Sequence, residues 1–222
     1  MESEAKNLVI VLGATAVGKS ATAIRLAEEF NGEIINCDSM QVYKGFDIGT
    51  DKIPLEQRKD IPHHLRDIVD PSTQFTAADF VKHALEAARS IGKKQKLPIV
   101  VGGTGLYLKA LCEGLFPEGE KDPEIRAKLE RQAEDKGLES LRKTLQKVDP
   151  VYAKKIGKND KIRIIRALEV FYATQKPISA HFANTQSPVD DFSILKIGLH
   201  IERSVLYEKI EDRVDRMFER GI

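Results

Sequence analysis

The feature that most constrains the fold is a glycine-rich turn near the N-terminus. Residues 13–20 read GATAVGKS and satisfy the pattern G-x-x-x-x-G-K-[ST]. The apolar, β-branched run at residues 8–12 before the turn is typical of a strand buried on both faces of a parallel sheet, and residues 20–29 after it have helical spacing. This strand–turn–helix context predicts a P-loop α/β fold, with an open parallel sheet flanked by helices.

The chemistry of this turn is anion binding. Glycines allow backbone N–H groups to point at phosphate oxygens, and the helix that follows adds its positive dipole end. We expect Lys19 to reach the terminal phosphates and the Ser20 hydroxyl to bind Mg²⁺. A P-loop indicates a bound di- or triphosphate but does not identify the reaction. The predicted phosphate-binding residues are Gly13, Ala14, Thr15, Ala16, Val17, Gly18, Lys19 and Ser20.

Two further strand ends are expected beside the P-loop. Short strands are predicted at residues 33–38 and 98–101, with an amphipathic helix over 75–91 between them. Asp38 and Thr104 follow these strands, and ligands of open α/β sheets bind beyond the carboxyl ends of the strands. Asp38 is a candidate proton acceptor or Mg²⁺ ligand, or a helix cap or turn residue. Thr104 lies between two glycines, so it either approaches an anion or opens the next helix.

The second half of the chain has a different character. Helical periodicity with many charges extends over most of residues 120–189, and the stretch from Lys121 to Lys176 contains 15 Lys and Arg against 9 Asp and Glu. This excess of positive charge indicates a polyanionic partner, although solvated lysine-rich helix faces are an alternative. We therefore predict a core formed by residues 1–119 and 190–222 and a helical insert at 120–189. A strand at 193–201 and a final helix at 205–220, with Leu206, Ile210, Val214 and Met217 or Phe218 on one face, complete the predicted core.

Other features exclude several classes of site. The first apolar run is too short for a signal peptide or membrane span, so a cytoplasmic location is expected. Cys37 and Cys112 lack the spacing of a disulfide framework or a zinc site. His63 and His64 are adjacent and do not share a face, so we expect a loop or packing role for them. A monomer without membrane contacts is expected.

Several long motifs together resemble the bacterial tRNA dimethylallyltransferase family over nearly the whole chain. They accompany the P-loop in the expected order. They are DSMQVYKGFDIGT at 38–50, PHHL at 62–65, DP at 70–71 with FTAADF at 75–80, GGTGLYLKA at 102–110, ND at 159–160, RALEV at 166–170, Arg203, and RVDRM at 213–217.

The resemblance implies a transferase that moves a dimethylallyl group from dimethylallyl diphosphate to a tRNA adenine next to the anticodon, with Mg²⁺. It implies that the P-loop holds the diphosphate, with Lys19 among the catalytic groups, that Asp38 is the general base, and that Thr104 lies where adenine and diphosphate meet. Arg203 matches an arginine that helps hold the diphosphate. The helical insert resembles a lobe that grips the anticodon stem-loop. The residues that it implies for tRNA contact are Asp38, Ser39, Met40, Gln41, Thr104, Arg126, Ile162, Arg163, Ile164, Ile165 and Arg166.

Two departures from the family pattern and three alternatives accompany this interpretation. Ala14 stands where proline is usual, and family members run on past the point that matches Ile222 with further tRNA contacts, so this chain looks cut short at its C-terminus. One alternative is an adenylate isopentenyltransferase, for which the basic insert has no evident use. The others are a P-loop phosphotransferase or NTPase, with Asp38 on a metal, and a non-catalytic RNA-binding module.

Overall fold

The computed structural model describes residues 6–115 and 122–222 and contains two compact units. The first comprises Met1–Glu113 with Ser187–Ile222, and the second comprises Gly114–Gln186. The sequence-based boundaries were 119/120, which lies outside the described residues, and 189/190. No helix among the described residues is long and apolar enough to cross a membrane.

The first unit is built on a five-stranded sheet in the order β3-β2-β4-β1-β5, and every pairing is parallel. Its central strands are buried along most of their length, which accounts for their continuous apolar runs. The predicted open parallel α/β sheet is confirmed. The strands are β1 (Lys6–Gly13), β2 (Gly32–Asn36), β3 (His63–His64), β4 (Leu97–Gly102) and β5 (Phe192–Leu199).

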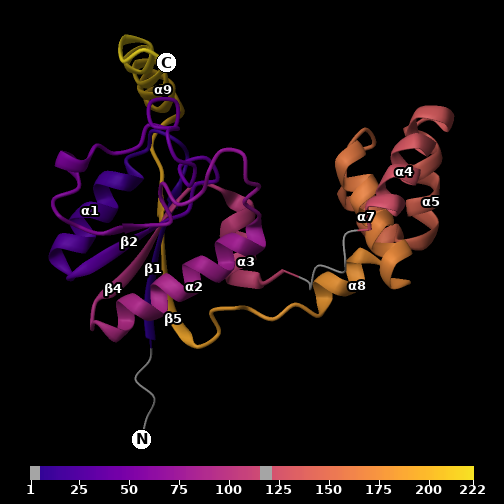
Figure 1. Cartoon of the computed structure of the whole chain (residues 1–222), viewed down its shortest axis with the longest axis horizontal. Helices are drawn as coiled ribbons and strands as arrows, with labels where there is room; N and C mark the ends of the chain where they lie inside the picture. Colours follow the sequence, from indigo (N-terminus) through magenta and orange to yellow (C-terminus); the bar gives the residue numbers. More distant parts are fainter. Residues whose placement is uncertain (1–5, 116–121) are drawn as a thin grey trace, which may run out of the picture. The chain divides into compact units, whose positions relative to one another are not determined.

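Helices cover this sheet on both faces (Figure 1). Alternate residues of β1 belong to different cores, because successive side chains of a strand point to opposite faces. Val9 and Val11 pack with α1 (Lys19–Glu29), whereas Leu8 and Ile10 share a core with residues of α2 (Ala77–Lys93) and α3 (Gly105–Glu113). The predicted helices at 20–29 and 75–91 are therefore present. A 3₁₀ turn, Leu55–Gln57, lies in the long segment between β2 and α2.

The two adjacent histidines form β3, a strand that the sequence did not predict. They pair with Ile34 and Ile35 of β2, and their side chains have different partners. His63 Nδ1 lies 2.8 Å from the Ile61 carbonyl oxygen, and His64 Nε2 lies 2.7 Å from a carboxylate oxygen of Glu33. Among the described residues, no group of three or more His, Cys, Asp or Glu side chains is arranged to hold a metal ion.

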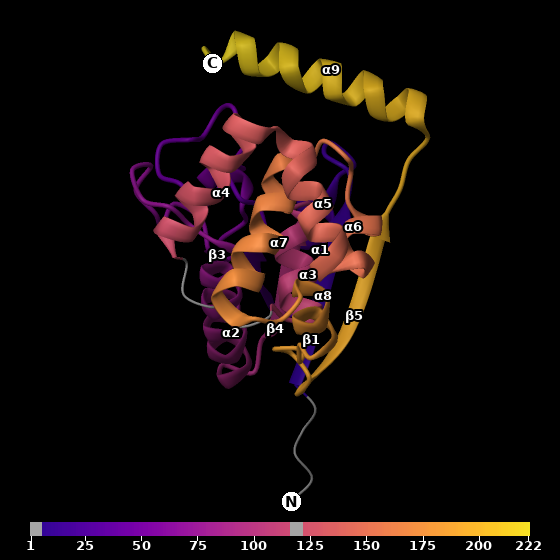
Figure 2. The same cartoon turned by 90° about the vertical axis from the view of Figure 1, so that its right-hand side faces the viewer.

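The final helix, α9 (Arg203–Glu219), follows β5 and lies across the end of the sheet that the carboxyl ends of the strands form (Figure 2). The predicted apolar face of this helix is only partly buried. Met217 is buried, Leu206 and Ile210 are half-buried, and Val214 and Phe218 are exposed. Of the two alternatives Met217 and Phe218, Met217 is the buried one, and the face stays partly open because α9 lies at the end of the sheet and not on one of its faces.

The second unit is helical, as predicted for the insert. Its core is formed mainly by Leu129, Leu141, Leu145, Ile164 and Leu168, which come from three helices. An Asp-Pro pair starts two of the helices, with aspartate as the N-cap and proline in the first turn, where the missing N–H costs nothing. The helices are α4 (Pro123–Lys136), α5 (Leu138–Val148), α6 (Pro150–Lys155), α7 (Lys161–Thr174) and α8 (Ile178–Ala183).

Candidate functional site

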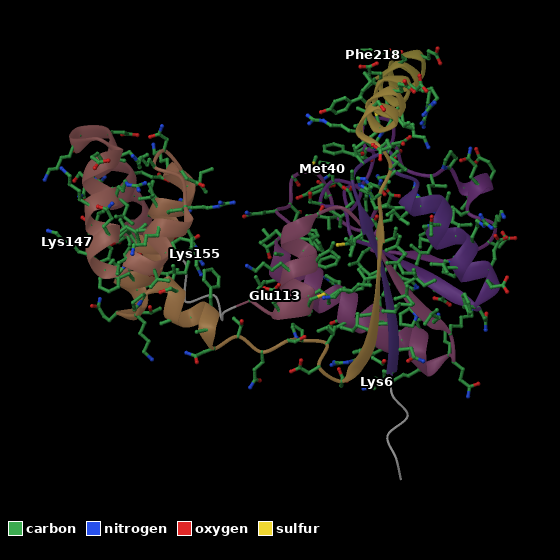
Figure 3. The ribbon with its side chains drawn as sticks, turned by 180° about the vertical axis from the view of Figure 1, so that it is seen from behind. Lys6, Met40, Glu113, Lys147, Lys155 and Phe218 are labelled. Carbon is green, nitrogen blue, oxygen red and sulfur yellow. The ribbon has the colours of Figure 1, made fainter. Side chains whose placement is uncertain are left out.

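A polar pocket of about 510 Å³ lies in the first unit, at the carboxyl ends of the strands. The loop after β1, the end of β4, the segment after β2 and one face of α9 contribute to it. Figure 3 shows Met40 at this end of the sheet, near α9, and Lys6 at the opposite end. Its lining residues include Thr15, Lys19, Ser20, Asp38, Gln41, Thr50, Asp51, Gly102, Lys209, Asp212, Arg213 and Arg216.

The P-loop has the backbone that its glycines allow. Gly13 has a φ of 150° and Gly18 a φ of 96°, and Gly18 is the N-cap of α1. Lys19 and Ser20 are the first residues of that helix and line the pocket. The Lys19 ammonium donates a hydrogen bond to the Ala14 carbonyl oxygen at 2.6 Å. The helix N-terminus and the ammonium thus face the same space, which suits an anion.

The ends of β2 and β4 are joined directly. The Ser39 N–H donates to Thr104 Oγ1 at 3.1 Å, and Cys37 N–H donates to the Val101 carbonyl oxygen at 2.7 Å. A side chain at Gly102 would overlap the backbone of Cys37, so only glycine allows this approach. Asp38 and Thr104, singled out separately in the sequence, are therefore brought together.

Asp38 forms a tight turn with its own segment. Its Oδ1 accepts hydrogen bonds from the N–H groups of Met40 at 2.8 Å and Gln41 at 3.2 Å. Within the described part of the chain, Oδ2 of Asp38 has no hydrogen-bond partner. The expected turn role and the expected site role are therefore compatible, because each uses a different oxygen.

Charges of both signs meet around Lys19. Burial lowers the pKa of its ammonium, the Asp38 carboxylate acts in the opposite direction, and the Arg213 guanidinium lowers the pKa further. The neighbouring Cys37 is buried, and burial raises the pKa of its thiol far above the ordinary value. The Lys19 ammonium thus lies near a second cation, Arg213, and a carboxylate, Asp38, while Cys37 is held as a neutral thiol.

Sequence reasoning missed the contribution of α9. Residues 209, 212, 213 and 216 line the pocket, and their spacing of three and four places them on one helix face. Arg213 Nη1 donates to Thr15 Oγ1, and its Nε lies 3.3 Å from an Asp51 carboxylate oxygen. This polar spacing was the signal that could have identified the face.

Arg203 does not line the pocket. Its Nε donates to the Tyr207 hydroxyl at 2.7 Å, and its guanidinium carbon lies 5.2 Å from the centroid of the Tyr207 ring. The expected role of Arg203 stays a prediction. The arginine of α9 that lines the pocket beside the P-loop is Arg213, on another face of the same helix.

The residues expected to contact tRNA fall in both units. In the first, Ser39 is half-buried, Met40 is exposed, and Gln41 lines the pocket. In the second, Arg126, Ile162 and Arg163 are exposed and Arg166 is partly exposed. Ile164 and Ile165 are buried in the helical core, so their side chains cannot meet RNA and instead hold α7 in place. For these two residues side-chain contact is thus not expected, and tRNA contact of the segment 162–166 stays a prediction.

Comparison with known proteins places these features in a family. The family model described as IPP transferase matches residues 41–222, and the one described as isopentenyl transferase matches residues 6–59. The tRNA dimethylallyltransferase of Geobacter metallireducens is 51% identical over 100% of this chain and 72% of its own length. That of Carboxydothermus hydrogenoformans is 46% identical over 98% of this chain and 70% of its own.

Solved structures agree with this placement. A eukaryotic dimethylallyltransferase described as acting on tRNA matches with a TM-score of 0.84 and 38% identity, covering 97% of this chain and 54% of the other. A tRNA isopentenylpyrophosphate transferase from Bacillus halodurans matches with a TM-score of 0.65 and 42% identity, covering 97% and 67%. This chain thus spans about half of the eukaryotic protein and about two thirds of the Bacillus protein. The chain belongs to the IPP transferase family of tRNA dimethylallyltransferases.

Proposed function

We propose that this protein transfers a dimethylallyl group from dimethylallyl diphosphate to the exocyclic amine of the adenine next to the anticodon in tRNA and releases diphosphate. One observation carries the assignment of the site: a single pocket holds the anion-binding P-loop and the Asp38 carboxylate together. Membership of the family supplies the reaction and the two substrates.

The P-loop side of the pocket suits the leaving group. An allylic C–O bond ionises readily when the departing diphosphate is stabilised. Backbone N–H groups before α1, the Lys19 ammonium and the Arg213 guanidinium all face this space and supply positive charge. Such fixed charges stabilise the transition state without reorganising during the reaction.

Ser20 is the protein group that we assign to Mg²⁺. Its hydroxyl lines the pocket directly beside Lys19, and hydroxyl oxygen is a suitable hard ligand. In P-loop sites the Ser or Thr hydroxyl that follows the lysine binds Mg²⁺, and substrate phosphates and water supply further ligands, which is the mode that Ser20 fits. When bound, the ion would neutralise charge that develops on the diphosphate.

The opposite side of the pocket suits the nucleophile. When the adenine nitrogen bonds to the allylic carbon, the C–O bond breaks, its electron pair leaves with the diphosphate, and the amine becomes acidic. Asp38 Oδ2 then accepts the amine proton, while Oδ1 keeps the turn in place through Met40 and Gln41. Thr104 holds the same turn through Ser39 and thereby positions the carboxylate.

The acceptor must reach this pocket as an unstacked base. Extruding an adenine from a single-stranded loop costs less than extruding it from a duplex, which favours the anticodon loop as the substrate. Exposed basic residues of α4 and α7, among them Arg126 and Arg163, are suited to the phosphate backbone. We assign RNA binding to the second unit on this basis.

One labelling experiment tests the function. Dimethylallyl diphosphate labelled in the prenyl group is incubated with Mg²⁺ and an anticodon stem-loop, AMP or ATP, and a parallel reaction contains γ-labelled ATP. We expect label only in the stem-loop RNA. Labelled AMP or ATP would indicate an adenylate isopentenyltransferase, phosphate transfer from ATP a phosphotransferase, and RNA binding without any transfer a binding module.

Asp38→Asn is the sharpest test of the base. Asparagine keeps a side-chain oxygen for the turn but cannot take the proton, so the single-turnover rate should fall by about 10²–10⁴. Stem-loop affinity, measured by fluorescence anisotropy, should stay close to that of the unaltered protein. A single-turnover rate that changes only a few-fold would exclude Asp38 as the base.

A further inference from the structure

The reaction outlined above makes no use of Lys52, a buried lysine in the segment between β2 and α2. Its side chain is 1% exposed. The ammonium donates to the Tyr43 carbonyl oxygen at 2.6 Å, to Asp47 Oδ1 at 2.8 Å and to Asp67 Oδ1. An ammonium carries three protons, so all of its donors are used.

The three acceptors come from parts of the segment that also pair through the backbone. Lys44 N–H donates to the Val69 carbonyl oxygen at 2.9 Å, and Ile68 N–H donates to the Val42 carbonyl oxygen at 3.0 Å. Lys52 therefore ties a short ladder, formed by residues 42–44 and 68–69, to the turn that contains Asp47.

This ladder and turn carry one wall of the pocket. Gln41 Nε2 donates to the Thr50 carbonyl oxygen at 2.9 Å, and both residues line the pocket. Asp51 lies between Thr50 and Lys52 in the chain and holds the Arg213 guanidinium at 3.3 Å. A displacement of Lys52 would thus be passed on to the wall and, through Asp51, to the arginine that faces the P-loop.

The backbone of this segment needs such an anchor. Asp51 and Asp67 both have positive φ, 53° and 56°, a region that costs a non-glycine residue free energy unless the surroundings impose it. Hydrogen bonding to Lys52 lowers the pKa of the Asp47 carboxyl, so this carboxylate is charged beside the ammonium. Loss of the ammonium would remove the one group that bonds both carboxylates and leave only the Arg66 guanidinium, 3.4 Å from Asp67 Oδ2, beside them, which favours opening of the segment.

We propose that Lys52 is a positioning residue: it touches no substrate but fixes the wall formed by Gln41, Thr50 and Asp51 against which the acceptor base is presented. This inference rests on the proposed function. Its structural part, anchoring of the wall, can be tested without any turnover.

The test compares Lys52→Met with Lys59→Met. Lys59 lies in the same segment but is exposed and pairs with the surface carboxylate of Glu28, so it is the matched control. Hydrogen exchange of peptides covering residues 40–52 should be faster in Lys52→Met, while peptides of β1 and α1 exchange as in the unaltered protein. In steady-state assays kcat/KM for the stem-loop should fall by about 10²-fold, the loss that a displacement of about 1 Å can cause. Lys59→Met should change neither readout.

Three results would overturn the proposal, and a fourth would separate it from the proposed function. Unchanged exchange over residues 40–52 in Lys52→Met would overturn the proposal, and so would an activity loss that equals the loss of folded protein with an unchanged KM. Lys52→Arg serves if Lys52→Met does not fold, because a planar guanidinium keeps the charge but cannot reproduce the three ammonium bonds; normal exchange and kcat/KM in that variant would also overturn it. If the unaltered protein transfers no prenyl group but local exchange rises, the proposed function fails and the anchoring role stands.

Discussion

At the scale of single residues, Glu33 illustrates how a buried charge contributes to stability. It is 1% exposed, and its carboxylate lies 2.7 Å from His64 Nε2 and 3.0 Å from Lys96 Nζ, with Lys94 slightly farther away. Burial alone would raise its pKa, but hydrogen bonds from His64, Lys96 and Lys94 outweigh burial and lower the pKa from 4.5 to about 2. The stabilisation is therefore complete above pH 4.5 and disappears as the pH falls toward 2.

We predict that Glu33→Gln lowers the free energy of unfolding by up to about 3 kcal/mol at pH 7, and that its difference from the unaltered protein shrinks between pH 4.5 and pH 2. Urea unfolding at several pH values measures this. Glu28→Gln removes an exposed carboxylate that pairs with Lys59 and should cost about 0.5 kcal/mol or less. A difference for Glu33→Gln that does not depend on pH in this range would contradict the assignment.

The sequence could not reveal this cluster. Glu33 is 31 residues from His64 and 61 from Lys94, and no local pattern links them. The P-loop residues, in contrast, are adjacent in the chain, so their shared role was evident from spacing alone. Asp38 and Thr104 were identified because strand ends of a parallel sheet meet at one edge, a rule that needs only the order of the elements.

At the scale of elements, β1 and α1 were evident from local sequence, whereas the orientation of α9 was not. Periodicity predicted that α9 exists, but it could not show which face meets the pocket, because that depends on where the helix lies at the end of the sheet. Val214 and Phe218, two apolar positions considered for one face of this helix, are exposed, whereas the polar face was overlooked. Strand β3 escaped prediction because two residues are too few to show a period.

The orientation of α9 gives a prediction that distinguishes two arginines of one helix. Arg213→Gln should raise the Kd for pyrophosphate about tenfold or more, since a hydrogen bond to a charged group contributes about 1.5–3 kcal/mol. Arg203→Gln should leave this Kd unchanged, because its side chain contacts Tyr207 outside the pocket. Isothermal titration calorimetry measures both values. An equal or larger effect of Arg203→Gln would restore the expectation drawn from family resemblance.

At the scale of the whole molecule, the positive charge is concentrated in one unit. Residues 114–186 contain 15 Lys and Arg against 11 Asp and Glu, whereas the net charge of the full chain is only +1. Lys147 and Lys155 are among the exposed cations of this unit (Figure 3). Some arginines already have carboxylate partners at the surface, such as Arg163 with Asp160 at 3.5 Å. Exposed pairs of this kind contribute little, so an RNA phosphate can replace the carboxylate at small cost.

The charge distribution therefore predicts a salt dependence that originates in the second unit. The logarithm of stem-loop affinity should fall linearly with the logarithm of salt concentration, and Arg126→Gln and Arg163→Gln should each reduce the slope by about 1, the change expected when one phosphate contact is lost. Lys82→Gln, an exposed lysine of α2 in the first unit, should leave the slope unchanged. Fluorescence anisotropy over a range of KCl concentrations measures all three. An arginine variant that weakens binding equally at every salt concentration would indicate a contact to a base, because only phosphate contacts release counterions.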